Sequence, residues 1–254
     1  MQIIISPAKK MRQDIDTLAP KGLPVFLEQT QQLYRVLLEM SPQQLQKMWK
    51  CNDSIASLNV ERLQKMDLCQ HLTPAILSYE GIQYQYMAPN VFELAHLDYV
   101  QEHLRILSGF YGLLRPFDGV TPYRLEMQAR LQVGEHRDLY HFWGSRLADR
   151  LAQESDVVVN LASREYSRTV EPHLPKRVRF VTCTFGEWSG EKIQEKGTMC
   201  KMARGQMVRW MAEHQVEQPE ELHSFQELGY QFSPAHSDET HYVFLKDKKL
   251  ESMA

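Results

Sequence analysis

Four apolar stretches of the chain have the pattern of buried β-strands. Residues 1–5 contain three consecutive isoleucines before Ser6-Pro7 ends the run, and residues 156–160 read DVVVN. Continuous apolar runs bounded by polar residues are typical of strands that are covered on both faces of a sheet. Residues 177–184 and 242–245 are rich in β-branched and aromatic side chains and predict two further strands.

Other stretches repeat their apolar positions with the period of a helix. Residues 26–40 have apolar or aromatic side chains at positions 26, 27, 33, 34, 37 and 38. Ser41 follows as an N-cap, with Pro42 at the first helical position and Gln44 completing a capping box. Similar patterns predict helices over 53–66, 98–107 with Asp98 as cap, 139–152 and 201–214.

Residues 75–87 do not follow the helical period. The alternation of Ile82, Tyr84 and Tyr86 favours a strand with one aromatic face, so we predict a β-hairpin here. Three tyrosines in such a row are able to stack on nucleobases, but a half-buried sheet face is the commoner arrangement.

These elements belong to one predicted domain. The 254-residue chain is long enough to bury a substantial core, and it has no internal repeat, low-complexity tract or obvious linker. We predict an α/β (mixed α+β) protein that forms a single compact domain over residues 1–254. Its central mixed sheet is flanked by helices, and residues 247–254 form a polar tail.

The segment 104–127, LRILSGFYGLLRPFDGVTPYRLEM, combines turn residues with arginines. Gly109 and Gly112 lie between apolar runs, where glycine permits a tight turn or a close backbone approach. The arginines of the segment are Arg105, Arg115 and Arg124. Arginines beside such turns indicate an anion site, and the alternative is a turn-rich connection with solvated arginines.

Charge is distributed unevenly along the chain. The net charge is −3, but residues 160–210 contain ten Lys or Arg against five Asp or Glu, so this window is +5 and the remainder −8. A polyanionic partner would be met by this window.

Polar residues with chemical potential follow the predicted strand at 156–160. They stand at a strand end and a helix start, where backbone amides and side-chain donors are presented to a ligand. Lys9 leaves the first strand in the same way. The candidates for catalysis are Asn160, Ser163, Glu165 and Tyr166, accompanied by Lys201 and Arg204. The alternative is a polar network that serves only the structure.

The absence of familiar motifs excludes several classes of protein. The sequence has no P-loop, no G-x-G-x-x-G after a strand, no nucleophile elbow and no H-E-x-x-H. The four cysteines form no C-x-x-C pair and the ten histidines are scattered, so we expect no disulfide framework, metal site or cofactor. No apolar run has the length of a membrane helix, and the first isoleucine run is too short for a signal peptide. We expect a cytoplasmic protein.

The sequence resembles the YaaA family of peroxide-stress resistance proteins, formerly a domain-of-unknown-function family. The motifs that match are ISPAK at 5–9, HLRILSGFYGLLRPFD at 103–118, PYRLEM at 122–127, LYHFWG at 139–144, NLASREY at 160–166 and K-x-A-R-G at 201–205. The resemblance implies a cytosolic bacterial protein of the hydrogen peroxide response that limits oxidative DNA damage and is linked to lower free intracellular iron. It also implies a mixed α/β fold, a helix-hairpin-helix-like element and binding to duplex or branched DNA. No membrane or protein partner is expected.

Carried to this chain, the DNA-binding role falls on basic residues and on the glycine-containing turn. The predicted contacts are Lys9, Arg105, Gly109, Gly112, Arg115, Arg124, Arg164, Lys201 and Arg204. The helix-hairpin-helix turn is placed at 109–112, although it reads G-x-x-G and not the usual G-x-G, and Met202 replaces an expected lysine. Segment 104–127 is thus predicted to be one wall of a basic cleft whose other wall is 160–205.

Two functions from different classes follow. The favoured one is a sequence-independent DNA-binding protein of the oxidative stress response. The other is an enzyme for a small phosphate- or nucleobase-containing substrate, which requires seven side chains to converge: Lys9, Asn160, Ser163, Glu165, Tyr166, Lys201 and Arg204. Direct iron binding has the least support.

Overall fold

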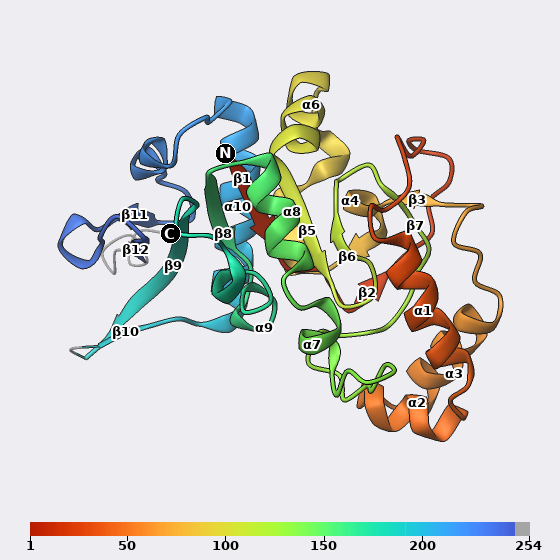
Figure 1. Ribbon diagram of the computed structural model, residues 1–254. Helices are drawn as coiled ribbons and strands as arrows, with labels where there is room; N and C mark the ends of the chain where they lie inside the picture. The colour runs from red at the N-terminus through yellow and green to blue at the C-terminus, as the bar shows by residue number, and fades with distance from the viewer. Residues whose placement is uncertain (191, 247–254) are drawn as a thin grey trace.

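An eight-stranded mixed sheet forms the centre of the computed structural model, which describes residues 1–190 and 192–246 (Figure 1). The strands follow the order β11-β12-β9-β8-β1-β5-β6, and β10 pairs with β9 beside this path. Their bounds are β1 Gln2–Ile5, β5 Leu104–Ser108, β6 Gly112–Leu114, β8 Val157–Leu161, β9 Arg179–Ser189, β10 Lys192–Gln194, β11 Tyr230–Phe232 and β12 His241–Lys246. Two small sheets pair β2 (Lys10–Met11) with β4 (Tyr79–Glu80) and β3 (Thr73–Pro74) with β7 (Gly119–Val120).

The five central strands of the large sheet are parallel, and their order contains a reversal. β1 comes first in the chain, β5 is added on one side of it, and β8, β9 and β12 are added on the other. The direction of addition therefore changes between β1 and β8. In open α/β sheets such a switch point opens a crevice beyond the carboxyl ends of the strands, and ligands bind there.

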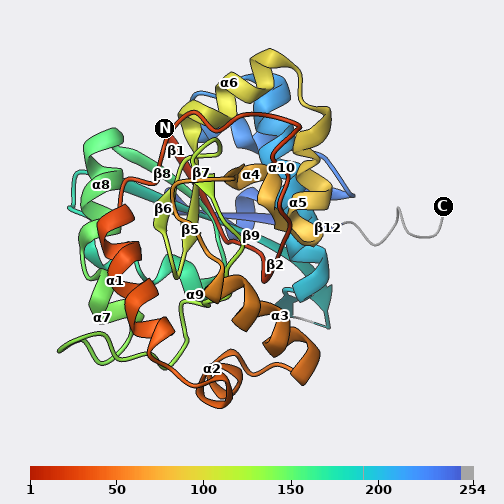
Figure 2. The same cartoon turned by 90° about the vertical axis from the view of Figure 1, so that its right-hand side faces the viewer.

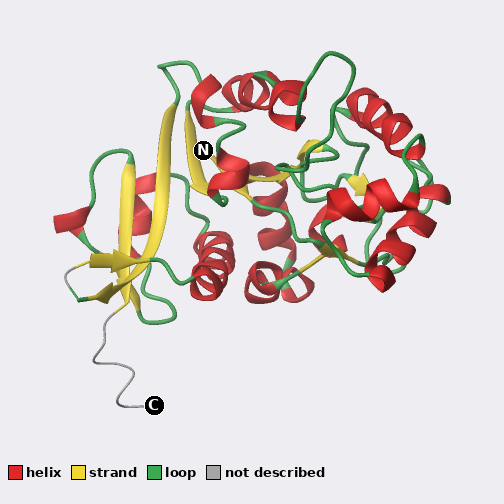
Figure 3. Ribbon diagram, turned by 90° about the horizontal axis from the view of Figure 1, so that it is seen from below, coloured by secondary structure: helices red, strands yellow, loops and turns green. Residues whose placement is uncertain are grey.

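Helices cover both faces of this sheet. Figure 1 shows α8 (Arg146–Glu154) in front of the strands and α10 (Gly197–His214) behind them, and Figure 2 shows the sheet between the two. Seen from below, the strands lie between helical layers (Figure 3). The other α-helices are α1 Leu27–Leu38, α2 Pro42–Trp49, α3 Asp53–Gln64, α4 Ala75–Ser78, α5 Ile82–Met87, α6 Leu94–His103, α7 Leu139–Trp143 and α9 Arg164–Ser167.

The structure confirms the mixed α/β class and most of the predicted elements. The three isoleucines of β1 are fully buried and belong to one continuous hydrophobic core. The capping box of α2 is present, because the Ser41 side chain accepts from the Gln44 amide while the Gln44 side chain accepts from the Ser41 amide. Within the described residues, no helix is long and apolar enough to cross a membrane. The predicted tail at 247–254 lies outside the described residues.

The hairpin predicted over 75–87 is wrong. This segment forms α4 and α5, joined by the two-residue strand β4. In α5 the buried residues are Gln83, Tyr84 and Met87, which share one helical face because Met87 is four positions after Gln83 and three after Tyr84. That face packs against α10, and this tertiary contact decides the conformation over the local alternation of apolar residues.

The helix predicted over 98–107 begins and ends earlier. Asp98 lies inside α6, and the helix stops at His103. Residues 104–108 form β5, which pairs in parallel with β1 over Ile3–Ile5. Long-range pairing with a buried strand therefore overrides the helical pattern.

The helix-hairpin-helix turn placed at 109–112 is also wrong, because this G-x-x-G joins two strands. β5 and β6 are antiparallel, with Ser108 opposite Gly112, which takes a φ of +73°. The amides of Phe110 and Tyr111 both donate to the Ser108 hydroxyl, at 3.1 and 2.8 Å. The turn is buried and two of its amides are occupied by Ser108. A β-carbon would be 2.5 Å from the Leu125 carbonyl oxygen at Gly109 and 2.7 Å from the Trp143 ring at Gly112, so both glycines serve packing.

Candidate functional site

A cavity of about 410 Å³ opens beyond the carboxyl ends of β1 and β8. We call it the switch-point pocket. Three parts of its lining follow strands: the loop after β1, the extended segment after β7 and the start of α9 after β8. The other two are helical, the start of α5 and the middle of α10. The lining residues are Ser6, Pro7, Ala8, Lys9, Lys10, Glu80, Gly81, Ile82, Gln83, Tyr84, Tyr123, Arg124, Leu125, Ser163, Glu165, Tyr166, Lys201 and Arg204.

Hydrogen bonds between two serines join the strand ends at the base of the pocket. The Ser6 hydroxyl accepts from the Ser163 amide at 2.8 Å and donates to the Ser163 hydroxyl at 3.2 Å. The Tyr84 hydroxyl donates to the Ser6 carbonyl at 3.0 Å. The S-P-A-K and N-L-A-S-R motifs therefore hold each other in place, which fixes the pocket between β1 and β8.

The K-M-A-R-G motif of α10 supplies two cations to the pocket, and close packing of Gly205 against α5 positions them. Gly205 lies so close to α5 that a β-carbon at this position would be 2.0 Å from the Gln83 carbonyl oxygen. Glycine is required there because any side chain would push the two helices apart. The close contact places Lys201 and Arg204 of the same helix at the pocket.

The pocket is basic. Five of its lining residues are cationic and two are acidic, Glu80 and Glu165. Ion pairs neutralise part of this charge: Lys10 contacts Glu80 at 3.0 Å, and Lys9 contacts Glu126 at 2.8 Å. Within the described part of the chain, the ion pairs of the two pocket arginines are long: Arg124 to Glu126 and Arg204 to Glu195, both at 3.5 Å.

Several buried polar atoms at this pocket lack a partner. Among the described residues, buried side-chain atoms without a hydrogen bond include Arg124 Nε, Arg204 Nε and Gln83 Nε2, and all three belong to lining residues. All three atoms are donors. Because leaving a buried donor unsatisfied is unfavourable, their convergence indicates a site built for a ligand that supplies acceptors.

The acidic and phenolic groups of the pocket are perturbed by burial. Burial raises the pKa of Glu165, and the nearby Glu126 carboxylate adds to this, while the amide of Gln128 and the charge of Lys9 act against it. Burial also raises the pKa of Tyr123 to about 12 and that of Tyr166 well above its ordinary value. Burial therefore shifts the Glu165 carboxyl toward its protonated form relative to an exposed glutamate.

Seven residues proposed from the sequence meet at this pocket: Lys9, Arg124, Ser163, Glu165, Tyr166, Lys201 and Arg204. Asn160 does not line it. Its side chain accepts from the Ala162 amide at 2.9 Å and donates to Thr182 at 3.3 Å, so it shapes the turn after β8. Arg164 is exposed and lies outside the pocket lining.

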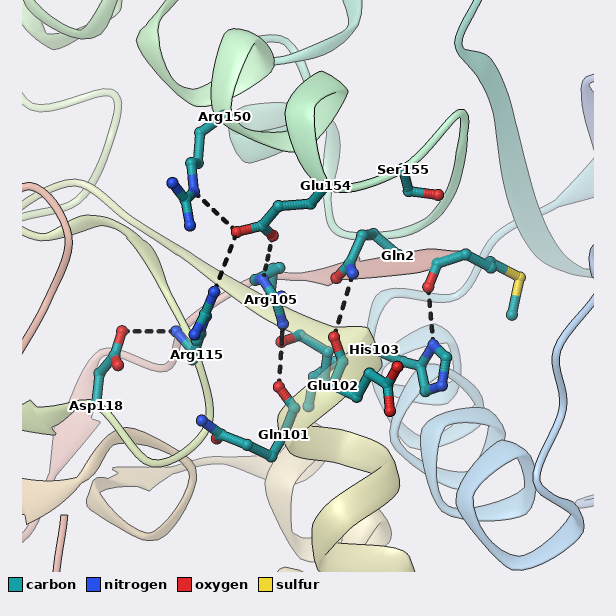
Figure 4. A network of polar contacts seen from close by, with 12 residues as sticks. Gln2, Gln101, Glu102, His103, Arg105, Arg115, Asp118, Arg150, Glu154 and Ser155 are labelled. Carbon is teal, nitrogen blue, oxygen red and sulfur yellow. Dashed lines mark hydrogen bonds and ion pairs between the residues drawn. The ribbon is translucent and has the colours of Figure 1, made fainter. Parts of the chain in front are cut away.

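Arg105 and Arg115 do not reach the pocket and lie at the other end of the parallel strands. We call their surroundings the Glu154 cluster, made of Arg105, Arg115, Asp118, Arg150 and Glu154 (Figure 4). Arg105 is near the start of β5, and Glu154 ends α8 just before β8 begins, so the cluster is at the amino ends of the parallel strands. Glu154 contacts Arg105 at 2.8 Å, Arg150 at 2.8 Å and Arg115 at 3.5 Å. The predicted basic cleft is therefore divided, and only residues 123–125 of segment 104–127 reach the pocket.

Sequence reasoning missed several pocket residues. Gln83 and Tyr84 were hidden by the incorrect hairpin over 75–87. Two acids outside the lining pair with the pocket arginines, and one of them, Glu195, shows no pattern that links it to Arg204. Glu126 had a detectable signal: it is two positions from Arg124, and residues so spaced in an extended segment point to one side. Within the described part of the chain, no three His, Cys, Asp or Glu side chains are placed to hold a metal ion.

The fold and the pocket define a mixed α/β protein with a basic pocket at the switch point of its parallel strands. Residues 1–236 match the family model described as "Peroxide stress protein YaaA". The chain belongs to this family. It is 54% identical over 246 residues to a UPF0246 protein of Lachnoclostridium phytofermentans, covering 97% of this chain and 96% of that protein. A UPF0246 protein of Agathobacter rectalis is 50% identical over 244 residues, 96% of this chain and 98% of the relative. The family description supports a role in oxidative stress.

Proposed function

We propose that the protein binds DNA without sequence specificity through the switch-point pocket and its rim, in the cytoplasm, during the response to hydrogen peroxide. The observation that carries the proposal is the convergence of five cations on one opening. Two of them have guanidinium Nε atoms without a partner in the part of the chain that the structure describes. Lys9 and Lys10 are largely exposed at the rim, with side chains 64% and 78% accessible. Exposed lysines suit backbone phosphates, which carry no sequence information.

Binding of this kind would also limit iron-dependent damage to DNA. A protein that neutralises phosphates with Lys and Arg releases the cations condensed on them. Ferrous ions are among the cations that phosphates attract. Covered DNA would therefore carry less iron at the positions where peroxide reacts with it.

Salt dependence tests the proposal. Anisotropy of a short labelled duplex, titrated with the full chain at several salt concentrations, should give a linear fall of log K with log salt, with a slope of about −0.9 for each phosphate neutralised. The Lys9→Ala, Lys201→Ala double variant should reduce the magnitude of that slope by nearly two. Arg137→Gln is the matched control, since its side chain is 76% exposed and lies outside the pocket. An affinity that ignores salt, or a double variant that binds like the control, would contradict the proposal.

An enzyme that acts on a small phosphate- or nucleobase-containing substrate is a second candidate for the same pocket. The position of Glu165 in a pocket with five cations favours it, and burial raises the pKa of this carboxyl, as is common for acid–base groups of active sites. Product analysis with a panel of nucleotides and sugar phosphates, comparing the wild type with Glu165→Gln, tests it. Turnover that persists in Glu165→Gln would remove Glu165 from the mechanism, and the absence of turnover throughout the panel would leave binding as the function.

A further inference from the structure

We infer that the switch-point pocket holds a single nucleotide unit. Its phosphate binds Arg124 and Arg204, the phosphate side of the pocket, and its base lies against Ile82, Tyr84 and Tyr123, the base side. The unit comes either from an unpaired position of a DNA strand or from a free mononucleotide. For DNA as the source, the inference rests on the proposed function.

The phosphate position follows from the two guanidinium groups. Arg124 and Arg204 come from different elements and line the same cavity, with side chains only 12% and 15% exposed. Within residues 1–190 and 192–246, the buried Nε of each has no hydrogen-bond partner. The Nη2 of each lies 3.5 Å from a carboxylate oxygen, that of Glu126 for Arg124 and that of Glu195 for Arg204. The Nε and Nη donors of arginine match two oxygens of a phosphate, so each group retains the edge that bidentate binding uses.

The base position follows from the apolar part of the lining, where Tyr84, Tyr123 and Ile82 stand. The tyrosine hydroxyls are already occupied. That of Tyr84 donates to the Ser6 carbonyl, and that of Tyr123 is 2.6 Å from the Ser108 hydroxyl and 2.8 Å from the Tyr79 hydroxyl. The part of each ring that lines the pocket is therefore apolar, and the hydroxyls are not free for the ligand. A nucleobase fits such a surface by stacking, whichever base it is.

A third contact suits the polar edge of a base. Gln83 is 7% exposed and its Nε2 has no partner among the described residues. Every nucleobase has an edge acceptor that one amide N–H is able to reach. This single donor adds little discrimination between bases, which agrees with binding that ignores sequence.

The size of the cavity selects one unit over a duplex segment. At about 410 Å³ it lies at the lower end of small-ligand pockets, which span about 300–1,000 Å³. A base that is stacked and paired in a duplex must leave the helix to enter, and an unpaired base does so at the least cost. Bulged or free nucleotides are therefore the preferred ligands.

Calorimetry with three probes separates the parts of the ligand. The full chain is titrated with dAMP, with deoxyadenosine and with inorganic phosphate. We expect dAMP to bind at least tenfold more tightly than either of the others, because only dAMP engages both sides of the pocket. If dAMP binds no more tightly than inorganic phosphate, the inference is overturned, even if duplex DNA binds strongly and the proposed function stands.

Two variants test which part of the pocket binds the phosphate and which part binds the base. Arg204→Gln should weaken dAMP and phosphate at least fivefold and leave deoxyadenosine unchanged. Ile82→Ala should weaken dAMP and deoxyadenosine about threefold and leave phosphate unchanged. Arg137→Gln serves again as the control, and thermal melting verifies that each variant is folded. The inference fails if both variants bind all three probes like the control.

A fluorescent base identifies the source of the nucleotide. 2-Aminopurine is placed in a one-nucleotide bulge or in a fully paired position of the same duplex. A fluorescence change on binding that is confined to the bulge and is lost in Arg204→Gln supports a nucleotide taken from DNA. If the bulged base does not respond while dAMP binds, the DNA source is overturned. If neither duplex binds at low salt while dAMP does, the proposed function fails and the nucleotide site remains.

Discussion

Arginines lie at both ends of the parallel strands, which we call the amino edge and the carboxyl edge of the sheet, but the two groups of arginines have different surroundings. At the amino edge, Arg105 donates to Glu154 and to the carbonyls of Gln101 and Leu104 (Figure 4). At the carboxyl edge, Arg124 and Arg204 each keep a buried Nε that has no partner among residues 1–190 and 192–246. Satisfied donors stabilise the fold, whereas unsatisfied ones are available to a ligand. The partners of an arginine, more than its presence in a motif, separate a structural cation from a binding cation.

The largest expected effect comes from removing the charge of Glu154, which contacts three arginines at the amino edge. Glu154→Gln removes the carboxylate that Arg105 contacts at 2.8 Å, and Arg105, whose side chain is 5% exposed, keeps only the weaker charge interaction with Asp118 among the described residues. Such losses typically cost about 3–5 kcal/mol. We expect chemical denaturation to show a loss of this order while affinity for DNA, measured where the variant is folded, stays near that of the wild type.

Glu213→Gln is the matched control for Glu154→Gln. It removes an i,i+4 ion pair to Arg209 in which both side chains are about one-third exposed. A surface pair of this kind contributes under about 1 kcal/mol. If the two variants lose the same stability, the Glu154 cluster is not the structural site described here.

Asp118 gives the amino edge a pH dependence. Burial raises its pKa from 3.8 to about 6, although the Arg115 amide and the charges of Arg115 and Arg105 favour the carboxylate. Since the folded state holds this proton more tightly, Asp118 stabilises the protein below about pH 4 and loses that contribution as the pH rises to about 6, by at most about 3 kcal/mol.

The isosteric variant Asp118→Asn isolates this contribution. It lacks the titration and keeps an acceptor for the Arg115 amide, which donates to Asp118 at 2.8 Å. The stability of the variant relative to the wild type should therefore increase between pH 4 and pH 7, as measured by denaturant unfolding at each pH. A difference that is constant over this interval would show that Asp118 has an ordinary pKa in the folded protein.

The carboxyl edge has a packing requirement that sequence alone did not reveal. In Gly205→Ala the added carbon would meet the Gln83 carbonyl, so α10 must move away from α5. Overpacking of this kind typically costs about 1–3 kcal/mol. Because α10 carries Lys201 and Arg204, we expect DNA affinity to fall together with stability. Ala203, buried on the same helix, gives a control: Ala203→Gly removes a methyl group without adding one, and should lower stability by about 1 kcal/mol while affinity is retained.

The parts of the molecule that the sequence predicted are those that local pattern decides. The isoleucines of β1, the valines of β8 and the capping box of α2 are specified by residues within a few positions of each other. Lys201 and Arg204 were recognised because the K-x-A-R-G motif is compact.

The parts that were not predicted depend on distant residues. α5 is helical because of its contact with α10, more than a hundred positions away. Arg105 is structural because Glu154, 49 positions further along the chain, accepts its hydrogen bond. No pattern within segment 104–127 distinguishes Arg105 from Arg124. Only the fold brings one to Glu154 and the other to the pocket.

The smallest expected effect is at the carboxyl edge, where removing the charge of a glutamate should strengthen ligand binding and leave the stability of the fold almost unchanged. Glu195 is 45% exposed and holds the Nη2 of Arg204 at 3.5 Å, so it competes with a ligand phosphate for this guanidinium. A long ion pair with one such exposed partner contributes at most about 1 kcal/mol. Glu195→Gln should therefore raise the affinity for dAMP and for duplex DNA by roughly two- to fivefold, with almost no change in stability. Loss of a carboxylate then strengthens binding at one edge of the sheet and weakens the fold at the other. Weaker binding in this variant would mean that Glu195 positions Arg204 for the ligand and does not compete with it.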